Sequence, residues 1–206
     1  MSDAENGEAL RRLPTQRRSR ERVERMLAAA TELIAEKGSD ALRMGEVAER
    51  AGVSIGSLYQ FFPDKAAVIR TLAERYNAAG RDCIRDGLAG VTDAAGLRTA
   101  FAALVDVYYG IFQAEPVMRD IWSGTQADPA LRDIDRTDSR INGAVLAEVM
   151  ARVNPGADRA AIDASAFLVM QLGEATMRLA ISVAPEEGRL LVETYKRMAI
   201  GEIARV

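Results

Sequence analysis

The residues of this chain best suited to chemistry lie on one short predicted helix, and that chemistry is hydrogen bonding. Over residues 55–61 the helical period leaves an outward face of small or polar side chains, namely Gly56, Ser57, Tyr59 and Gln60. Hydroxyl and carboxamide groups on such a narrow face can bond phosphate oxygens and base edges in the major groove of DNA. We therefore expect this helix to contact double-stranded DNA.

The preceding residues are those needed to present that helix. Gly52 can adopt the left-handed conformation that ends a helix, and Ser54 can cap the next helix by accepting a backbone N–H. Ala48 is small enough for two helices to cross closely. Residues 44–51 and 55–61 are thus predicted to form two short helices joined by a tight turn.

The composition excludes several kinds of catalytic and metal site. The 206 residues include no histidine, which excludes His–Ser and His–Cys nucleophilic catalysis as well as Cys/His zinc sites. Cys83 is the only cysteine, so no intrachain disulfide can form, as is typical of a reducing cytoplasm. No run approaches the ~20 apolar residues that a membrane span needs. We expect a cytoplasmic protein that is not an enzyme and has no catalytic residue, metal, cofactor or membrane partner.

The charge distribution says more than the net charge of −3. Residues 11–25 contain seven arginines and two glutamates. Such charge runs are commonly just solvated, and for Arg11 and Arg12 solvation and DNA contact stay equally open. The arginines from Arg17 onward share a helix beside the two short helices, which favours contact with phosphates.

Helical spacing of apolar residues continues along the rest of the chain. Residues 1–16 are polar and interrupted by Pro14, and we interpret them as a flexible arm. Beyond them apolar residues recur at threes and fours between glycine and proline breaks. The predicted helices cover residues 17–37, 44–51, 55–61, 65–86, 97–112, 118–122, 129–153, 158–183 and 186–203. The predicted fold class is all-α with nine helices.

Three segments together resemble the N-terminal DNA-binding domain of the tetracycline-repressor (TetR) family. They are the leading helix around residues 25–34, the run Val-Ala-Glu-Arg-Ala-Gly-Val-Ser at 47–54, and Gly-Ser-Leu-Tyr-Gln-Phe-Phe-Pro-Asp-Lys at 56–65. The resemblance covers roughly residues 17–66. It implies a homodimeric transcriptional regulator, usually a repressor that a small-molecule effector releases from its operator.

The resemblance also implies roles for single residues. Gly56 and Gln60 match positions that face the groove, and a glutamine can pair with adenine. The positions that match phosphate contacts are Ser54, Ser57, Tyr59 and Lys65. Lys65 stands in the first turn of its helix, where a cation opposes the helix dipole, so an external anion is a reasonable partner.

Two residues depart from the family pattern. Arg43 stands where the family usually has a Thr or Ser that caps the second helix and touches a phosphate. An arginine cannot cap in this way, although its charge can still reach a phosphate. Phe61 occupies a position that is often His or Tyr, so we expect a polar backbone contact to be absent there.

The C-terminal part carries apolar and aromatic residues at helical spacing, which line a ligand cavity or simply form core. The candidates for a ligand pocket are Tyr108, Trp122, Met170 and Gln171. Glu174 and Arg178 are four residues apart on one helix and are expected to satisfy each other.

The last two helices are the expected dimer interface. A stripe of small and apolar residues on the eighth and ninth helices would build a four-helix interface between two subunits. The residues assigned to it are Ala164, Leu168, Leu172, Leu191, Tyr195 and Met198. Two-fold symmetry then predicts a palindromic operator with half-sites about 34–36 Å apart.

The predicted domains are a helix-turn-helix domain at 17–64 and a ligand-binding and dimerisation domain at 65–206. A helical small-molecule carrier or enzyme, and an interaction module with a vestigial helix-turn-helix, are the alternatives. No nucleophile–base pair or phosphate loop supports an enzyme.

Overall fold

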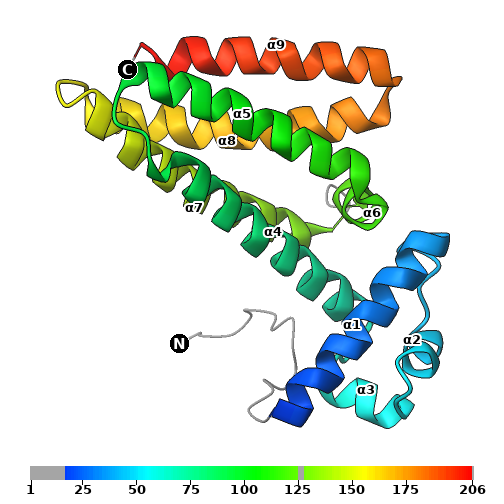
Figure 1. The fold of residues 1–206 in the computed structure, drawn as a ribbon. Coiled ribbons are helices and arrows are strands. Elements are labelled where there is room, and N and C mark those ends of the chain that lie inside the picture. The colour runs from blue at the N-terminus through cyan, green and yellow to red at the C-terminus, as the bar shows by residue number, and fades with distance from the viewer. Residues whose placement is uncertain (1–16, 125–127, 206) are drawn as a thin grey trace. The chain divides into compact units, whose positions relative to one another are not determined.

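The computed structural model describes residues 17–124 and 128–205, which form nine α-helices and no strand (Figure 1). This confirms the predicted all-α fold. The helices are α1 Arg17–Lys37, α2 Met44–Arg50, α3 Ile55–Phe61, α4 Lys65–Ala89, α5 Ala94–Ala114, α6 Pro116–Gly124, α7 Pro129–Val153, α8 Arg159–Ser182 and α9 Pro185–Ile203. The predicted arm at residues 1–16 lies outside the described residues.

The ends of the short helices follow from local residues. Gly52 has φ +63°, the left-handed conformation that the turn after α2 requires. Ser54 caps α3, and Asp64 Oδ1 accepts the N–H of Ala67 at 2.7 Å in the first turn of α4. Arg43 has the extended backbone of an N-cap residue but makes no side-chain cap bond, as expected for an arginine.

The fourth helix is longer than predicted. We expected a break beginning at Gly87, but α4 continues to Ala89. A Cβ at Gly87 would lie 2.6 Å from Cδ2 of Leu104 on α5, so the glycine makes room for a leucine from the neighbouring helix. A glycine inside a helix is tolerated where close packing compensates for its low propensity.

The chain forms two compact units. The first contains the described residues up to Tyr76 and those within 116–131, and the second contains 77–115 and those from Arg132 onward. The boundary between these compact units lies inside α4, and α6 belongs to the same unit as the helix-turn-helix. Packing of α6 against α1 explains this grouping, and Asp120 Oδ2 accepts the N–H of Ser39 at 2.8 Å.

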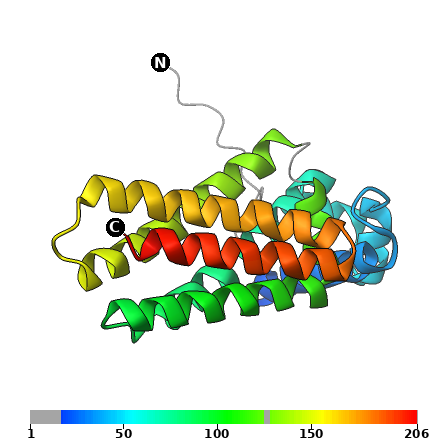
Figure 2. The same ribbon diagram turned by 90° about the horizontal axis from the view of Figure 1, so that it is seen from above.

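Each unit has its own core. In the first unit the fully buried side chains include Met26 of α1, Leu58 of α3 and Phe62. In the second unit α5, α8 and α9 run side by side (Figure 2), with Phe112 and Met177 buried between helices. Among the described helices none has the length and apolar character needed to cross a membrane.

Candidate functional site

The outward face of α3 is the first candidate site. Gly56, Tyr59 and Gln60 are exposed, whereas Leu58 and Phe61 are buried against the rest of the unit. Tyr59 is 42% exposed, and its hydroxyl has no hydrogen-bond partner among the described residues. Helix α3 thus presents a free hydroxyl, a carboxamide and a position without a side chain, which suits close approach to another surface.

Two serines at the start of α3 are hydrogen-bonded within the unit. Ser54 Oγ accepts the backbone N–H of Ser57 at 3.1 Å, and Ser57 Oγ accepts from Arg22 Nη1 at 3.3 Å. Both hydroxyls are used as acceptors in these bonds. Each therefore keeps its own O–H to donate, for example to a phosphate oxygen.

Lys65 has acceptors inside the protein. Its ammonium donates to the carbonyl oxygens of Asp40 at 3.0 Å and Ser39 at 3.3 Å, in the turn between α1 and α2. The unfavourable position of Lys65 against the helix dipole is thus compensated within the chain. An ammonium has three donors, so one remains for an external acceptor.

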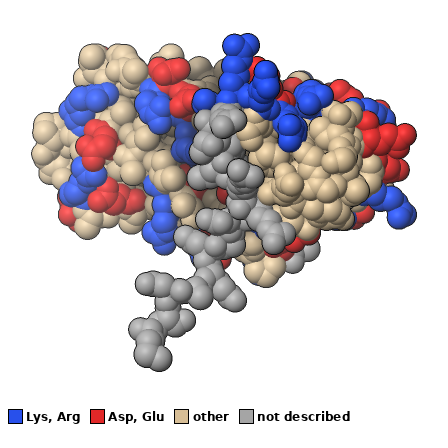
Figure 3. Space-filling model, turned by 90° about the horizontal axis from the view of Figure 1, so that it is seen from below, with Lys and Arg blue, Asp and Glu red and all other residues tan. Residues whose placement is uncertain are grey.

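The surroundings of α3 supply positive charge that α3 lacks. The sequence of α3 contains no charged residue, and Arg18, Arg20, Arg25 and Arg43 nearby in the unit are all exposed. Figure 3 shows an uncharged area with Lys and Arg side chains along one edge and Asp and Glu side chains at another. Basic groups that flank an uncharged polar helix are the distribution expected for phosphate contacts around a groove-reading element.

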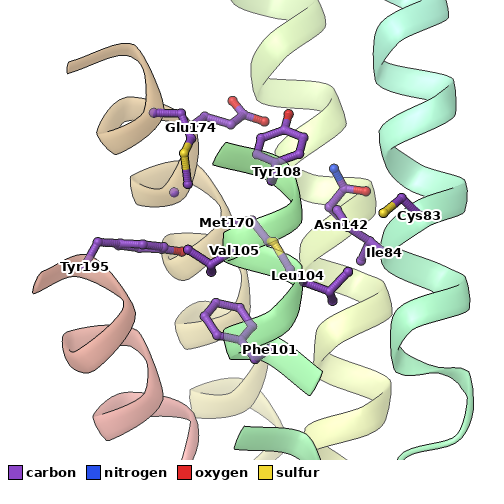
Figure 4. Close-up of a pocket in the computed structure, with 12 residues that line it drawn as sticks. Cys83, Ile84, Phe101, Leu104, Val105, Tyr108, Asn142, Met170, Glu174 and Tyr195 are labelled. Atoms are coloured by element: carbon purple, nitrogen blue, oxygen red, sulfur yellow. The ribbon is translucent and has the colours of Figure 1, made fainter. Parts of the chain in front are cut away.

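The second candidate site is a cavity of about 60 Å³ inside the second unit (Figure 4). Its lining includes two of the predicted pocket residues, Tyr108 and Met170, but neither Trp122 nor Gln171. Trp122 is buried in the first unit, where its ring and that of Tyr76 form a T-shaped pair with centroids 6.1 Å apart. The residues that line the cavity are Cys83, Ile84, Phe101, Leu104, Val105, Tyr108, Asn142, Met170, Gly173, Glu174, Met177 and Tyr195.

Sequence reasoning missed the carboxyl group in this cavity. Glu174 lines it at 6% exposure, and its Oε2 is buried without a hydrogen-bond partner among the described residues. The expected Glu174–Arg178 pair is wrong, because Arg178 Nη1 instead bonds Asp135 Oδ2 at 2.9 Å. Burial, and then the neighbouring Asp135, raise the pKa of Glu174 well above its ordinary value, to the basic side of neutrality.

A second buried acid lies next to the cavity. Asp138 forms an ion pair with Arg81, and its Oδ2 accepts from Asn142 Nδ2 at 2.9 Å. Burial raises the pKa of Asp138, although the Arg81 guanidinium opposes the shift. Asn142 Oδ1 is buried with no hydrogen-bond partner within the described part of the chain. Two acceptors, Glu174 Oε2 and Asn142 Oδ1, are therefore left without donors at the cavity.

Tyr195, which was predicted to lie in the dimer interface, points into the second unit instead. Tyr195 is only 8% exposed, lines the cavity and donates its hydroxyl to the carbonyl of Val169 at 2.7 Å. A Cβ at Gly173 would lie 2.8 Å from that hydroxyl oxygen, so the Tyr195 ring fits here because residue 173 has no side chain. This packing places Tyr195 on the cavity side of α9, away from solvent.

The other residues assigned to the interface keep an outward position. Ala164, Leu168, Leu172 and Met198 are exposed, and Leu191 is half-buried. Leu179 and Leu190 are also exposed, the latter at 67%. Leu190 belongs to the apolar face predicted for the last helix, whereas Leu179 adds an exposed leucine to α8 that was not predicted.

The fold and its first site define an all-helical protein with an N-terminal helix-turn-helix, and comparison with known proteins agrees. The family model for bacterial regulatory proteins of the tetR family matches residues 26–72. A second model, for the tetracyclin repressor-like C-terminal domain, matches residues 95–205, more than half of the chain. The chain therefore belongs to the TetR family of transcriptional regulators.

Curated relatives match over about a third of this chain. The HTH-type transcriptional repressor KstR of Mycolicibacterium smegmatis is 36% identical over 74 residues, which are 35% of this chain and 36% of that protein. The uncharacterized HTH-type transcriptional regulator YvdT of Bacillus subtilis is 35% identical over 72 residues, 35% of this chain and 37% of that protein. The chain thus matches about a third of the length of these relatives.

Solved structures match over most of the chain. A TetR-family transcriptional regulator from Streptomyces coelicolor has a TM-score of 0.68 and 25% identity, and the match covers 90% of this chain and 99% of that one. RolR in complex with its ligand resorcinol has a TM-score of 0.61 and 20% identity, covering 94% of this chain and 97% of that one. The RolR likeness shows the fold alone.

Proposed function

We propose that the protein is a homodimeric repressor that binds a palindromic operator and is released by a small, partly apolar ligand. The observation that carries the proposal is the outward face of α3, with exposed Tyr59 and Gln60 on a helix that has no charge of its own. Arg22 of α1 bonds Ser57 of this helix, and the exposed Arg43 belongs to the same unit. Such a face reads base edges while its basic border holds phosphates.

Exposure supports the roles proposed for single residues of this face. Gln60 and Gly56 are proposed to face the groove, because both are exposed and the Gln60 carboxamide has no hydrogen bond to any described residue. Tyr59 and the two serines, Ser54 and Ser57, are proposed to donate their O–H groups to phosphates. The roles of Arg43 and Lys65 are proposed to be electrostatic, since one is exposed and the other keeps one free donor.

A dimer would cover the exposed leucines of α8 and α9. Leu168, Leu172 and Leu190 are large apolar side chains on solvent-facing surfaces of two adjacent helices. Contiguous apolar patches of this kind mark interaction sites, and a two-fold dimer buries the same patch of both subunits. Two copies of α3 would then meet successive major grooves of one palindrome.

Release by a ligand would act through α4. This helix begins at Lys65 in the first unit and supplies Cys83 and Ile84 to the cavity of the second. A ligand that displaces these side chains shifts a helix that continues into the DNA-binding unit. It shifts the equilibrium only by its difference in affinity for the two states.

The test is binding of the full chain to the DNA that flanks its own gene, measured by mobility shift. We expect a specific complex whose affinity falls steeply as salt rises, because phosphate contacts release counterions. An unrelated duplex of equal length is the control. Equal affinity for both duplexes would favour the alternative, a helical small-molecule-binding protein or interaction module with a vestigial helix-turn-helix.

A further inference from the structure

The charged groups around the cavity are not balanced. Asp135 has its own guanidinium in Arg178 of α8, and Asp138 has Arg81 of α4. Glu174 is the third acid of this cluster, and no ion pair reaches it in the described part of the chain. Three acids therefore share two cations, and the cluster is neutral only while one acid holds a proton.

The hydrogen-bonding groups at the cavity have the same deficit. Glu174 Oε2 and Asn142 Oδ1 are both buried acceptors without a hydrogen bond in the described part of the chain. The Ser139 hydroxyl, also buried and without a hydrogen bond there, is the one neutral donor beside Glu174, and it favours the charged carboxyl. Figure 4 shows Glu174 and Asn142 on either side of Tyr108, with the apolar side chains of Phe101 and Leu104 further along the cavity. What would complete this end of the cavity is a group with several N–H donors and one positive charge.

We propose that the effector is a small organic cation, a primary amine with an apolar body, whose ammonium group binds between Glu174 and Asn142. This inference rests on the proposed function, since it names the chemical class of the ligand that releases the DNA. The apolar part would lie against Phe101, Leu104 and Met170, where the lining has no charge. A buried carboxylate is tolerated only when it is paired, and the ammonium provides that pairing.

Binding of the cation is coupled to a proton. In the empty cavity Glu174 is protonated, because burial and Asp135 of α7 disfavour its charged form. When the ammonium enters, the carboxyl gives its proton to the buffer and pairs with the cation. The other titratable groups that face it are Asp138 and Arg81, Arg178, and the hydroxyls of Tyr108 and Tyr195, whose pKa values burial raises further from neutrality.

The size of the cavity limits the probe. One water molecule needs roughly 10–15 Å³ of such space, so about 60 Å³ holds roughly four to six water-sized groups. Isobutylamine is of this size, and isobutanol has the same shape without a charge. Titration of the full chain with each probe, followed by ¹H–¹⁵N NMR in the absence of DNA, compares the two directly.

We expect isobutylamine to bind about tenfold or more tightly than isobutanol at pH 7, because a charge-assisted bond replaces a neutral one. Its dissociation constant should fall about tenfold from pH 6 to pH 7, one proton being released per cation bound. In E174Q, which keeps the shape of the neutral carboxyl, amine binding should weaken about tenfold or more and lose its pH dependence. The control E187Q removes an exposed carboxylate from α9 and should change neither quantity.

Three results would overturn the inference. They are absence of amine binding, isobutanol binding as tightly as the amine, and an unchanged amine affinity in E174Q. Because the titration contains no DNA, it is independent of the mobility shift. If the protein binds the amine but not DNA, the proposed function fails and the ligand class stands. If it binds DNA but not the amine, the proposed ligand class fails and the DNA-binding function stands.

Discussion

Ser54 Oγ accepts the backbone N–H of Ser57 at 3.1 Å, so the N-cap residue of α3 stabilises the helix before any DNA is present. Replacing Ser54 by Ala should lower the free energy of unfolding by about 1 kcal/mol, the usual cost of losing a cap. Ser54→Asp keeps an acceptor for the cap but brings a negative charge toward phosphates. We expect S54D to unfold near the wild-type denaturant midpoint and to bind DNA more weakly. Normal DNA affinity in S54D would remove Ser54 from the phosphate contacts.

Tyr59 offers a clean test of phosphate contact, because Tyr59→Phe removes one exposed oxygen and little packing. Loss of a hydrogen bond to a charged group costs about 1.5–3 kcal/mol, so DNA affinity should fall by roughly ten- to a hundredfold. Fluorescence anisotropy should show the same factor for the operator and for an unrelated duplex. An unchanged affinity, with an unchanged melting temperature, would show that the hydroxyl does not touch DNA.

Gln60 should behave differently from Tyr59. Replacing Gln60 by Ala removes a carboxamide that can pair with adenine, so discrimination at one base pair of each half-site should drop by about 1–3 kcal/mol. Binding to a set of operators with single base changes measures this preference. If the order of preference among those operators stays the same in Q60A, Gln60 does not read a base.

The exposed leucines of α8 predict the effect of a charge at the proposed interface. Leu168→Glu together with Leu172→Glu would bury unpaired carboxylates in a dimer, and should raise its dissociation constant by about a hundredfold or more. Analytical ultracentrifugation measures this. Val107→Glu places one such charge at an exposed apolar position of α5 and is the control. A double variant that remains dimeric would exclude this face of α8 from the interface.

Glu174 predicts a pH dependence of stability. Its folded pKa is raised, so between the ordinary carboxyl pKa and the folded one the native state holds a proton that the unfolded state has lost. Stability from this group is complete at low pH and declines as pH rises, with a limiting slope of about 1.4 kcal/mol per pH unit. E174Q lacks this slope. Urea unfolding from pH 5 to pH 8 should show the free energy of unfolding of E174Q rising relative to that of the wild type. If the two free energies change with pH in parallel, the raised pKa of Glu174 is contradicted.

The sequence by itself determined the helix-turn-helix, because its signals are local. Gly52 ends α2, Ser54 caps α3 and Asp64 caps α4 through contacts within three residues or through one backbone angle. Such contacts join residues that are close along the chain, so the sequence alone is enough to predict them. The family resemblance of this region, and the all-α class, could be recognised for the same reason.

Only the tertiary structure decided which side of each C-terminal helix meets which neighbour. The apolar pattern of α9 is compatible with Tyr195 facing outward. The ring of Tyr195 instead packs into the cavity, in the space that is open because Gly173 on α8 has no side chain. Arg178 likewise bonds Asp135 on α7, although Glu174 is closer along the chain. These choices depend on partners distant in sequence, and helical periodicity carries no information about them. The unpaired carboxyl of Glu174, and with it the character of the cavity, therefore emerged only when the helices were packed.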